Sequence, residues 1–138
     1  MTSPILLDTC ALLWIAQDEP IGAEAVAALD ALWLEGLAPL VSPISAWEVG
    51  MLSARGRIVL TMSPGRWWRE AIERLGLELA PMSPELLIAS TQLPGVAPND
   101  PADRIVAATA REQNLRLMTR DSKLLAYGEA GRLQTIIC

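Results

Sequence analysis

The sequence predicts a single α/β domain in which helices flank a central parallel sheet of about four to five strands. A chain of 138 residues is long enough for one domain with one continuous core. Short apolar runs alternate along it with longer segments that have helical spacing. This alternation is typical of parallel strands joined by helices. We find no repeat, linker or low-complexity segment, and therefore expect one domain over residues 1–138.

Each predicted strand is a short apolar run. The strands are expected at residues 4–7 (PILL), 38–42 (APLVS), 77–81 (LELAP), 116–119 (RLMT) and 135–138 (TIIC), with a brief extended piece at 58–60 (IVL). The helices are expected at residues 9–17, 21–36, 44–56, 64–76, from 84 to before 93, 101–114, and as a short turn after 121. Pro64 and Pro84 suit first helical positions, and Gly36 and Gly56 suit helix ends.

The composition indicates a protein that acts in the cytoplasm. No apolar run reaches the roughly 18 residues of a membrane span, and the start of the chain lacks the basic region of a signal peptide. The two cysteines, Cys10 and Cys138, form neither a disulfide framework nor a zinc pattern, which fits a reducing compartment.

The apolar content is high for a small domain, with 51% hydrophobic residues and a mean hydropathy of +0.30. Core packing accounts for a single tryptophan, since this residue is mostly buried in folded proteins. The excess as a whole favours a protein–protein interface. We therefore expect a homodimer whose interface uses some of the helices that carry Trp14, Trp33 or Trp67-Trp68.

Histidine is absent, which excludes Ser–His–Asp and Cys–His catalysis and any site with a histidine ligand. The formal net charge of −5 also gives no basic surface for nucleic acid overall. The arginines of the local clusters at 55–57 and 66–74 are available for phosphate contacts, although a solvated rim is the more common role for such arginines. Catalysis must rest on carboxylates, hydroxyls, arginines or a hard metal ion.

Four acidic residues stand where a parallel sheet gathers function, beyond the carboxyl ends of its strands. Asp8 directly follows the first strand and Asp121 the fourth, Asp103 lies in the first turn of the helix feeding that fourth strand, and Glu48 lies in the helix after the second. Helix capping or surface exposure explains each one alone. Together they would repel one another without a counter-ion. The sequence therefore predicts a Mg²⁺ or Mn²⁺ site at Asp8, Glu48, Asp103 and Asp121.

Two other α/β functions fit poorly. A response-regulator receiver needs an acidic pair after strand one and an aspartate after strand three, whereas Asp8 stands alone and strand three runs into "APMSP". Dinucleotide binding needs a glycine-rich turn after strand one, and none follows.

Three blocks in order resemble the PIN domain, specifically the VapC-like toxins of bacterial toxin–antitoxin pairs. They are "ILLDTCALLW", "ISAWEVGMLSARGRI" and "NDPADRIVAATAREQNLRLMTRD", and the likeness extends to the closing "QTIIC". The resemblance implies a Mg²⁺- or Mn²⁺-dependent ribonuclease, a hydrolase with Asp8, Glu48, Asp103 and Asp121 as its acidic site. It also implies a homodimer and inhibition by a small VapB-like antitoxin with a DNA-binding module.

The sequence leaves some questions open. Many relatives carry a histidine before the "DP" pair and an aromatic residue after it, where this chain has Asn99 and Ala102, so the RNA and the bond that is cut stay undefined. Asp100, Ser45 and Thr119 lie near the expected site without an assigned role, and the site suits one metal ion or two. The alternative to an endoribonuclease is a catalytically weak metal-binding protein that acts mainly in an antitoxin complex on operator DNA.

Overall fold

The computed structural model describes residues 2–138 and shows five parallel strands in one sheet, in the order β3-β2-β1-β4-β5. The strands are β1 (Ile5–Leu7), β2 (Leu40–Val41), β3 (Glu78–Leu79), β4 (Arg116–Thr119) and β5 (Gln134–Ile137). The helices are α1 (Thr9–Ala16), α2 (Ala23–Leu34), α3 (Pro43–Ala54), α4 (Pro64–Leu75), α5 (Pro84–Ser90), α6 (Pro101–Glu112) and α7 (Ser122–Glu129). The predicted fold class is confirmed.

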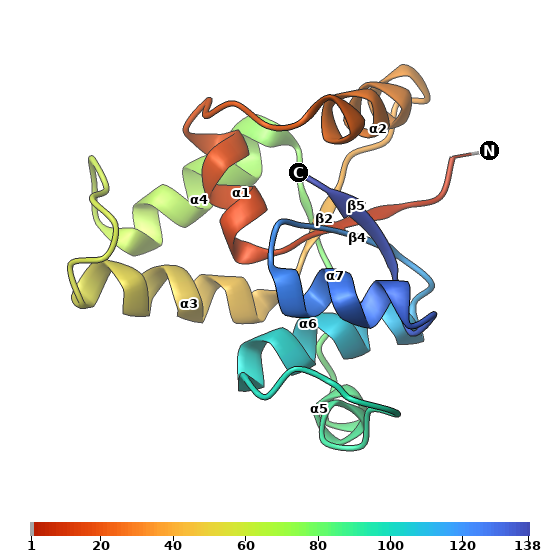
Figure 1. Ribbon diagram of the computed structural model, residues 1–138. Helices are drawn as coiled ribbons and strands as arrows, with labels where there is room; N and C mark the ends of the chain where they lie inside the picture. Colours follow the sequence, from red (N-terminus) through yellow and green to blue (C-terminus); the bar gives the residue numbers. More distant parts are fainter. Residues whose placement is uncertain (1) are drawn as a thin grey trace.

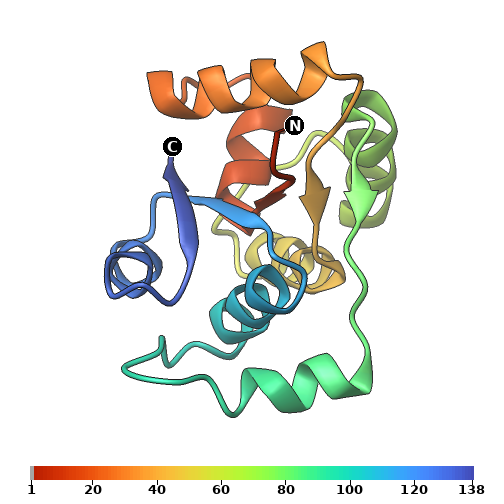
Figure 2. The same ribbon diagram turned by 90° about the vertical axis from the view of Figure 1, so that its right-hand side faces the viewer.

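Helices cover both faces of the sheet. Figures 1 and 2 show α1, α2 and α4 on one side and α5, α6 and α7 on the other. Successive side chains of a strand point to opposite faces, so Ile5 and Leu7 of β1 join the core under α1, α2 and α4, while Leu6 joins the core under α6 and α7. All three are fully buried, which explains the unbroken apolar run that predicted this strand.

Helix ends follow the local signals that the sequence carries. Pro43, Pro64, Pro84 and Pro101 each occupy a first helical turn, where a missing N–H leaves no bond unmade. Gly76 follows α4 with a φ of +64°, a left-handed conformation that favours glycine.

The extended piece expected at residues 58–60 is not a strand. These residues belong to the irregular loop between α3 and α4, and Val59 is 89% exposed. Ile58 and Leu60 are instead partly buried and pack against the core from this loop, which accounts for the apolar character of the segment without a strand. The helix expected at 101–114 ends at Glu112, since Asn114 adopts a positive φ of 54°. Within residues 2–138, no helix is both long and apolar enough to cross a bilayer.

Candidate active site

Asp8 lies where β1 ends and α1 begins, and its side chain is held from two directions. Its Oδ1 accepts a hydrogen bond from the N–H of Ala11 at 2.7 Å, which caps α1. Its Oδ2 accepts one from the hydroxyl of Thr119 at 2.6 Å. Thr119 ends β4, the strand beside β1, so this bond ties the carboxyl ends of the two central strands together.

Asp121 lies two residues beyond β4 and caps α7. Its Oδ1 accepts hydrogen bonds from the N–H groups of Lys123 and Leu124, at 2.9 and 3.0 Å. Its own N–H donates to the Thr119 hydroxyl at 3.0 Å. One buried hydroxyl therefore donates to the carboxylate of Asp8 and accepts from the backbone of Asp121, which fixes both residues at the same edge of the sheet.

Glu48 approaches from α3. Its Oε1 accepts a hydrogen bond of 2.5 Å from the hydroxyl of Thr9, the residue that follows Asp8. The Thr9 hydroxyl also lies 2.9 Å from that of Ser45, which is fully buried one turn before Glu48. This pair of hydroxyls joins α1 to α3 and orients the Glu48 carboxylate toward the start of α1.

Asp103 lies in the first turn of α6, where Asp100 caps the helix and accepts a hydrogen bond from the Asp103 N–H at 3.1 Å. Burial, as the largest cause, and the charges of Asp100, Asp121, Glu48 and Asp8 together raise the pKa of Asp103 to about 7. Charges act in this way only over short distances, so the acids that follow β1 and β4 and those of α3 and α6 share one electrostatic environment.

The carboxyl groups of Asp8 and Glu48 respond to the same environment. Burial is the main cause that raises the pKa of Asp8, and hydrogen bonds from Thr119 and Ala11 oppose it. Burial likewise raises the pKa of Glu48, the Thr9 hydroxyl opposes it, and the charges of Asp100 and Asp8 add to it. Ionised forms of these groups are disfavoured until a positive charge arrives.

No direct ion pair supplies that charge. Across the described part of the chain, residues 2–138, the one salt bridge joins Arg66 to Glu70. In the same residues no three acidic or cysteine side chains converge as a ready-made ligand set for a metal. The carboxylates are thus neighbours held on separate elements, with oxygen donors suited to a hard divalent cation. On donor chemistry and charge, they fit Mg²⁺ or Mn²⁺.

The PIN-domain family model matches residues 5–130 of this chain. The chain belongs to the PIN-domain family. A relative from Mycobacterium tuberculosis (strain ATCC 25618 / H37Rv), named Ribonuclease VapC22, is 30% identical over 127 residues, covering 92% of this chain and 93% of its own.

Solved structures share the fold of this PIN domain at low identity. VapBC2 from Rickettsia felis, bound to a fragment of promoter DNA, matches with a TM-score of 0.65 and 15% identity over 96% of this chain and 98% of its own. FitAB bound to the IR36 DNA fragment matches with a TM-score of 0.57 and 21% identity over 96% and 94%. FitAcB from Neisseria gonorrhoeae matches with a TM-score of 0.54 and 21% identity over 95% of each chain.

Two side chains near the acids of this PIN domain escaped the sequence reasoning. The Cys10 residue is exposed, but its thiol is partly desolvated by its neighbours, and this desolvation together with the charges of all four acids raises the pKa of the thiol to about 11. Arg120 stands between Thr119 and Asp121, and its charge lowers the pKa of Asp8. The sequence signal that could have found them is proximity to the acids, because Cys10 lies two residues after Asp8 and Arg120 lies one residue before Asp121.

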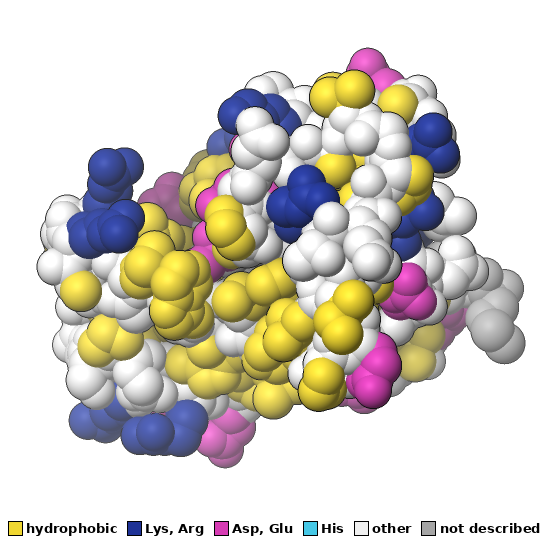
Figure 3. All heavy atoms as spheres, turned by 90° about the horizontal axis from the view of Figure 1, so that it is seen from below, with side chains coloured by type: hydrophobic (Ala, Val, Ile, Leu, Met, Phe, Trp, Pro, Cys, Tyr) yellow, Lys and Arg dark blue, Asp and Glu magenta, His cyan; other side chains and the backbone are white. Residues whose placement is uncertain are grey.

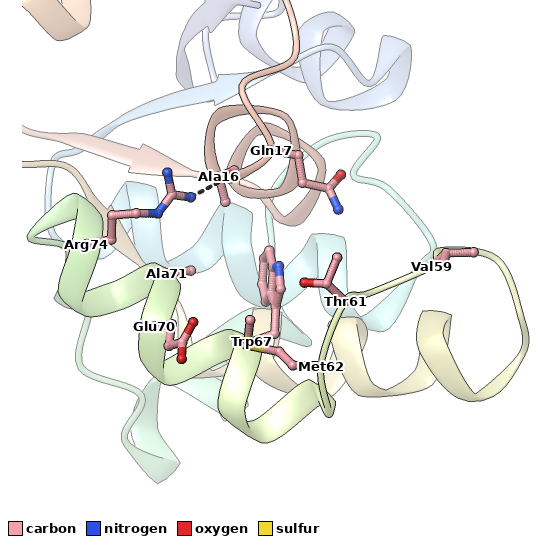
Figure 4. A pocket seen from close by; sticks show the side chains of 9 residues that line it. All are labelled: Ala16, Gln17, Val59, Thr61, Met62, Trp67, Glu70, Ala71 and Arg74. Atoms are coloured by element: carbon pink, nitrogen blue, oxygen red, sulfur yellow. Dashed lines mark hydrogen bonds between the residues drawn. The ribbon is translucent and has the colours of Figure 1, made fainter.

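A separate pocket of about 280 Å³ lies between α1, α4 and the loop before α4 (Figure 4). Trp67 forms part of its wall, and the guanidinium of Arg74 donates to the backbone oxygen of Ala16. None of the four acids lines it, so the chemistry of this PIN domain is not expected there.

Proposed function

We propose that this chain is a metal-dependent endoribonuclease toxin of the VapC type, which hydrolyses RNA phosphodiester bonds. The observation that carries the proposal is that four carboxylates without a salt bridge act on one another: burial, together with the charges of the neighbouring acids, raises the pKa of Asp103 to about 7. A relative of similar length is named a ribonuclease, and this supports the reaction class. The chain contains no histidine, so no imidazole is available as a general acid or base, and the carboxylates are proposed for the chemistry.

We expect Asp8, Glu48, Asp103 and Asp121 to hold Mg²⁺ or Mn²⁺. When bound, such an ion lowers the pKa of water and neutralises charge on a phosphodiester. The protein contributes orientation. Thr119 and the Ala11 N–H hold the Asp8 carboxylate, and Thr9 holds that of Glu48. Because Asp103 is only part-buried, it exchanges a proton with solvent at neutral pH.

Protein partners form the second part of the proposal. Solved structures with this fold contain VapBC2 on promoter DNA and FitAB on a DNA fragment, which supports an antitoxin and an operator complex for this chain. An arginine side chain of the antitoxin suits the four acids, because a guanidinium can donate two parallel hydrogen bonds to a carboxylate. Antitoxin and Mg²⁺ should then compete, so rising metal concentration should release inhibition.

A homodimer is part of the same proposal. Figure 3 shows hydrophobic side chains gathered on the face formed by α3 and α5, where Trp47, Leu87 and Ile88 are 55%, 39% and 59% exposed. Trp33 of α2 is also 46% exposed, whereas Trp67 is buried and serves the core. Exposed apolar patches of this kind are typical of interfaces. We therefore propose the α3–α5 face as the dimer interface, in place of the helices with Trp14, Trp33 or Trp67-Trp68 that the sequence favoured.

The second candidate function is a weakly catalytic metal-binding protein that acts mainly in an antitoxin–DNA repressor complex. The observation that favours it is that no three ligand side chains within residues 2–138 converge in advance. A site that must close around its ion is compatible with slow turnover.

The deciding experiment is cleavage of a defined RNA by purified, antitoxin-free protein with Mn²⁺, with and without chelator. We expect cleavage that chelator abolishes and that Asp8→Asn and Asp103→Asn also abolish, since each removes one charge from the ligand set. Asp30→Asn, on the exposed surface of α2, is the matched control and should cleave as the wild type does. Metal binding without measurable turnover would favour the repressor function instead.

A further inference from the structure

A second pocket, of about 490 Å³, opens where β5 ends. Its walls come from the segment that leads into α2, from Arg120 and from the last two residues of the chain, and they are mostly apolar. Pro20, Ile21, Ile137 and Cys138 provide apolar surface, and Glu24 provides the acidic group. The volume falls within the roughly 300–1,000 Å³ of pockets that bind small organic molecules.

The guanidinium of Arg120 is fixed at the wall of this pocket. It lies over the ring of Trp14, 3.9 Å from the centroid, and its Nη2 donates to the backbone oxygen of Cys138 at 2.7 Å. Within residues 2–138, no Asp or Glu carboxylate pairs with it, since the one salt bridge there joins Arg66 to Glu70. The residue therefore holds a positive charge in a fixed position at the pocket wall, where its other N–H groups can receive an anion.

This charge stands beside the acid cluster. Arg120 separates Thr119 from Asp121 in the chain, and its charge lowers the pKa of both Asp8 and Cys138. A polyanion that approaches four carboxylates on a protein of net charge −5 is repelled unless a cation holds it. Arg120 is a cation that lies at this edge of the sheet, between the acids and an apolar pocket.

We propose that Arg120 and this pocket form a binding subsite for one nucleotide of the RNA substrate, next to the bond that is cut. The guanidinium contacts a phosphate, and the apolar walls accept the base. The inference rests on the proposed ribonuclease function and deepens it. Glu24 lies in the same wall and repels a second phosphate, which restricts the phosphate to the Arg120 side.

The test measures binding without cleavage. A fluorescein-labelled single-stranded RNA of about ten nucleotides is titrated in chelator at low salt, and anisotropy gives the affinity. We expect Arg120→Ala to weaken binding about tenfold, the effect of one charge-assisted hydrogen bond. The slope of log affinity against log salt should fall by about 0.7, the value for one phosphate of a single strand.

Three variants separate the contribution of the Arg120 charge to RNA binding from that of the apolar pocket wall and from the general effect of removing an arginine. Arg120→Lys should keep the salt slope and lose part of the affinity, because lysine lacks the planar fork that stacks on Trp14. Ile137→Ser should weaken binding about threefold with an unchanged slope, since that side chain is already half exposed. Arg111→Ala, at an exposed position in the last turn of α6, is the control and should bind RNA as the wild type does.

The outcomes distinguish the subsite from the reaction. Arg120→Ala that folds by circular dichroism and binds RNA with wild-type affinity and slope would overturn the subsite, even if the wild type cleaves RNA. A wild type that binds RNA through Arg120 but never cleaves it would overturn the ribonuclease function alone. An Arg120→Ala variant that binds RNA normally and loses only antitoxin inhibition would assign the pocket to a protein partner and refute the proposal.

Discussion

Replacing Asp103 by asparagine should stabilise the metal-free protein at pH 8 and leave its stability unchanged at pH 4. In the folded protein the pKa of this carboxyl rises from 3.8 to about 7. Between these values the folded state holds a proton that the unfolded state has released, so the free energy of unfolding falls as pH rises through this window. Above pH 7 the wild type carries the full cost of the buried charge, which asparagine lacks.

The magnitude follows from the shift and from the exposure of the side chain. A rise of this size corresponds to roughly 4 kcal/mol at 1.36 kcal/mol per unit. Asp103 is only part-buried, and solvent screening reduces this to about 2 kcal/mol. A carboxylate in the first turn of α6 also gains about 0.3–1 kcal/mol from the helix dipole, which asparagine forfeits. The net gain of about 1 kcal/mol should raise Tm by about 4 °C.

Thermal unfolding by circular dichroism in chelator, at pH 8 and at pH 4, measures the effect. Asp30→Asn, at an exposed position of α2, serves as the control and should shift Tm by less than a degree or two at either pH. Saturating Mn²⁺ should then stabilise the wild type at pH 8 and leave Asp103→Asn nearly unchanged, because a ligand stabilises only the state that binds it. A variant less stable than the wild type at pH 8, or equally stabilised at both pH values, would refute the account of this site.

Three further results are expected. Gly128→Ala should lower the free energy of unfolding by about 1–3 kcal/mol in urea titrations, because a Cβ there would stand 2.7 Å from the Thr135 side chain. A variant as stable as the wild type would show that Thr135 of β5 moves aside without cost. Cys10, although exposed, should react slowly with iodoacetamide at pH 8, because its thiol pKa is about 11, and Mn²⁺ should speed the reaction; fast labelling in chelator would contradict the electrostatics. Trp47→Glu should convert a dimer at tens of micromolar into a monomer in light scattering, whereas a wild type that is already monomeric would exclude the α3–α5 interface.

The strands could be predicted from the sequence where an apolar run also pairs along its full length in the sheet. The bounds of β4 match the prediction residue for residue, because its apolar run is flanked by a helix end and an acidic cap. The expected strands at 38–42 and 77–81 shrink to two residues each, since pairing at one edge of the sheet, rather than composition, sets their length. Residues 58–60 were wrongly predicted as extended, because Ile58 and Leu60 reach the core as side chains of an irregular loop.

The acidic residues of the candidate site could be predicted from the sequence, but the groups that hydrogen-bond to them and orient them could not. Functional residues of parallel sheets gather beyond the carboxyl ends of the strands, so Asp8 and Asp121 could be placed at that edge from the sequence. Thr119 was noticed, but its role as a bridge between two acids depends on the register of β1 against β4, which sequence does not specify. Arg120 was missed because its guanidinium is held by contacts with Trp14 and Cys138, which are distant from it in the chain.

The pairing of β1 with β4 sets the time at which the protein can become active during its own synthesis. The hydroxyl that fixes Asp8 belongs to a residue 111 positions later in the chain, and the strand that carries it must dock between β1 and β5. A ribosome makes on the order of 5–20 residues per second, so the first acid waits several seconds for its partner strand. If the four acids form the active site, as proposed, a nascent chain cannot assemble that site until the residues up to Asp121 have emerged.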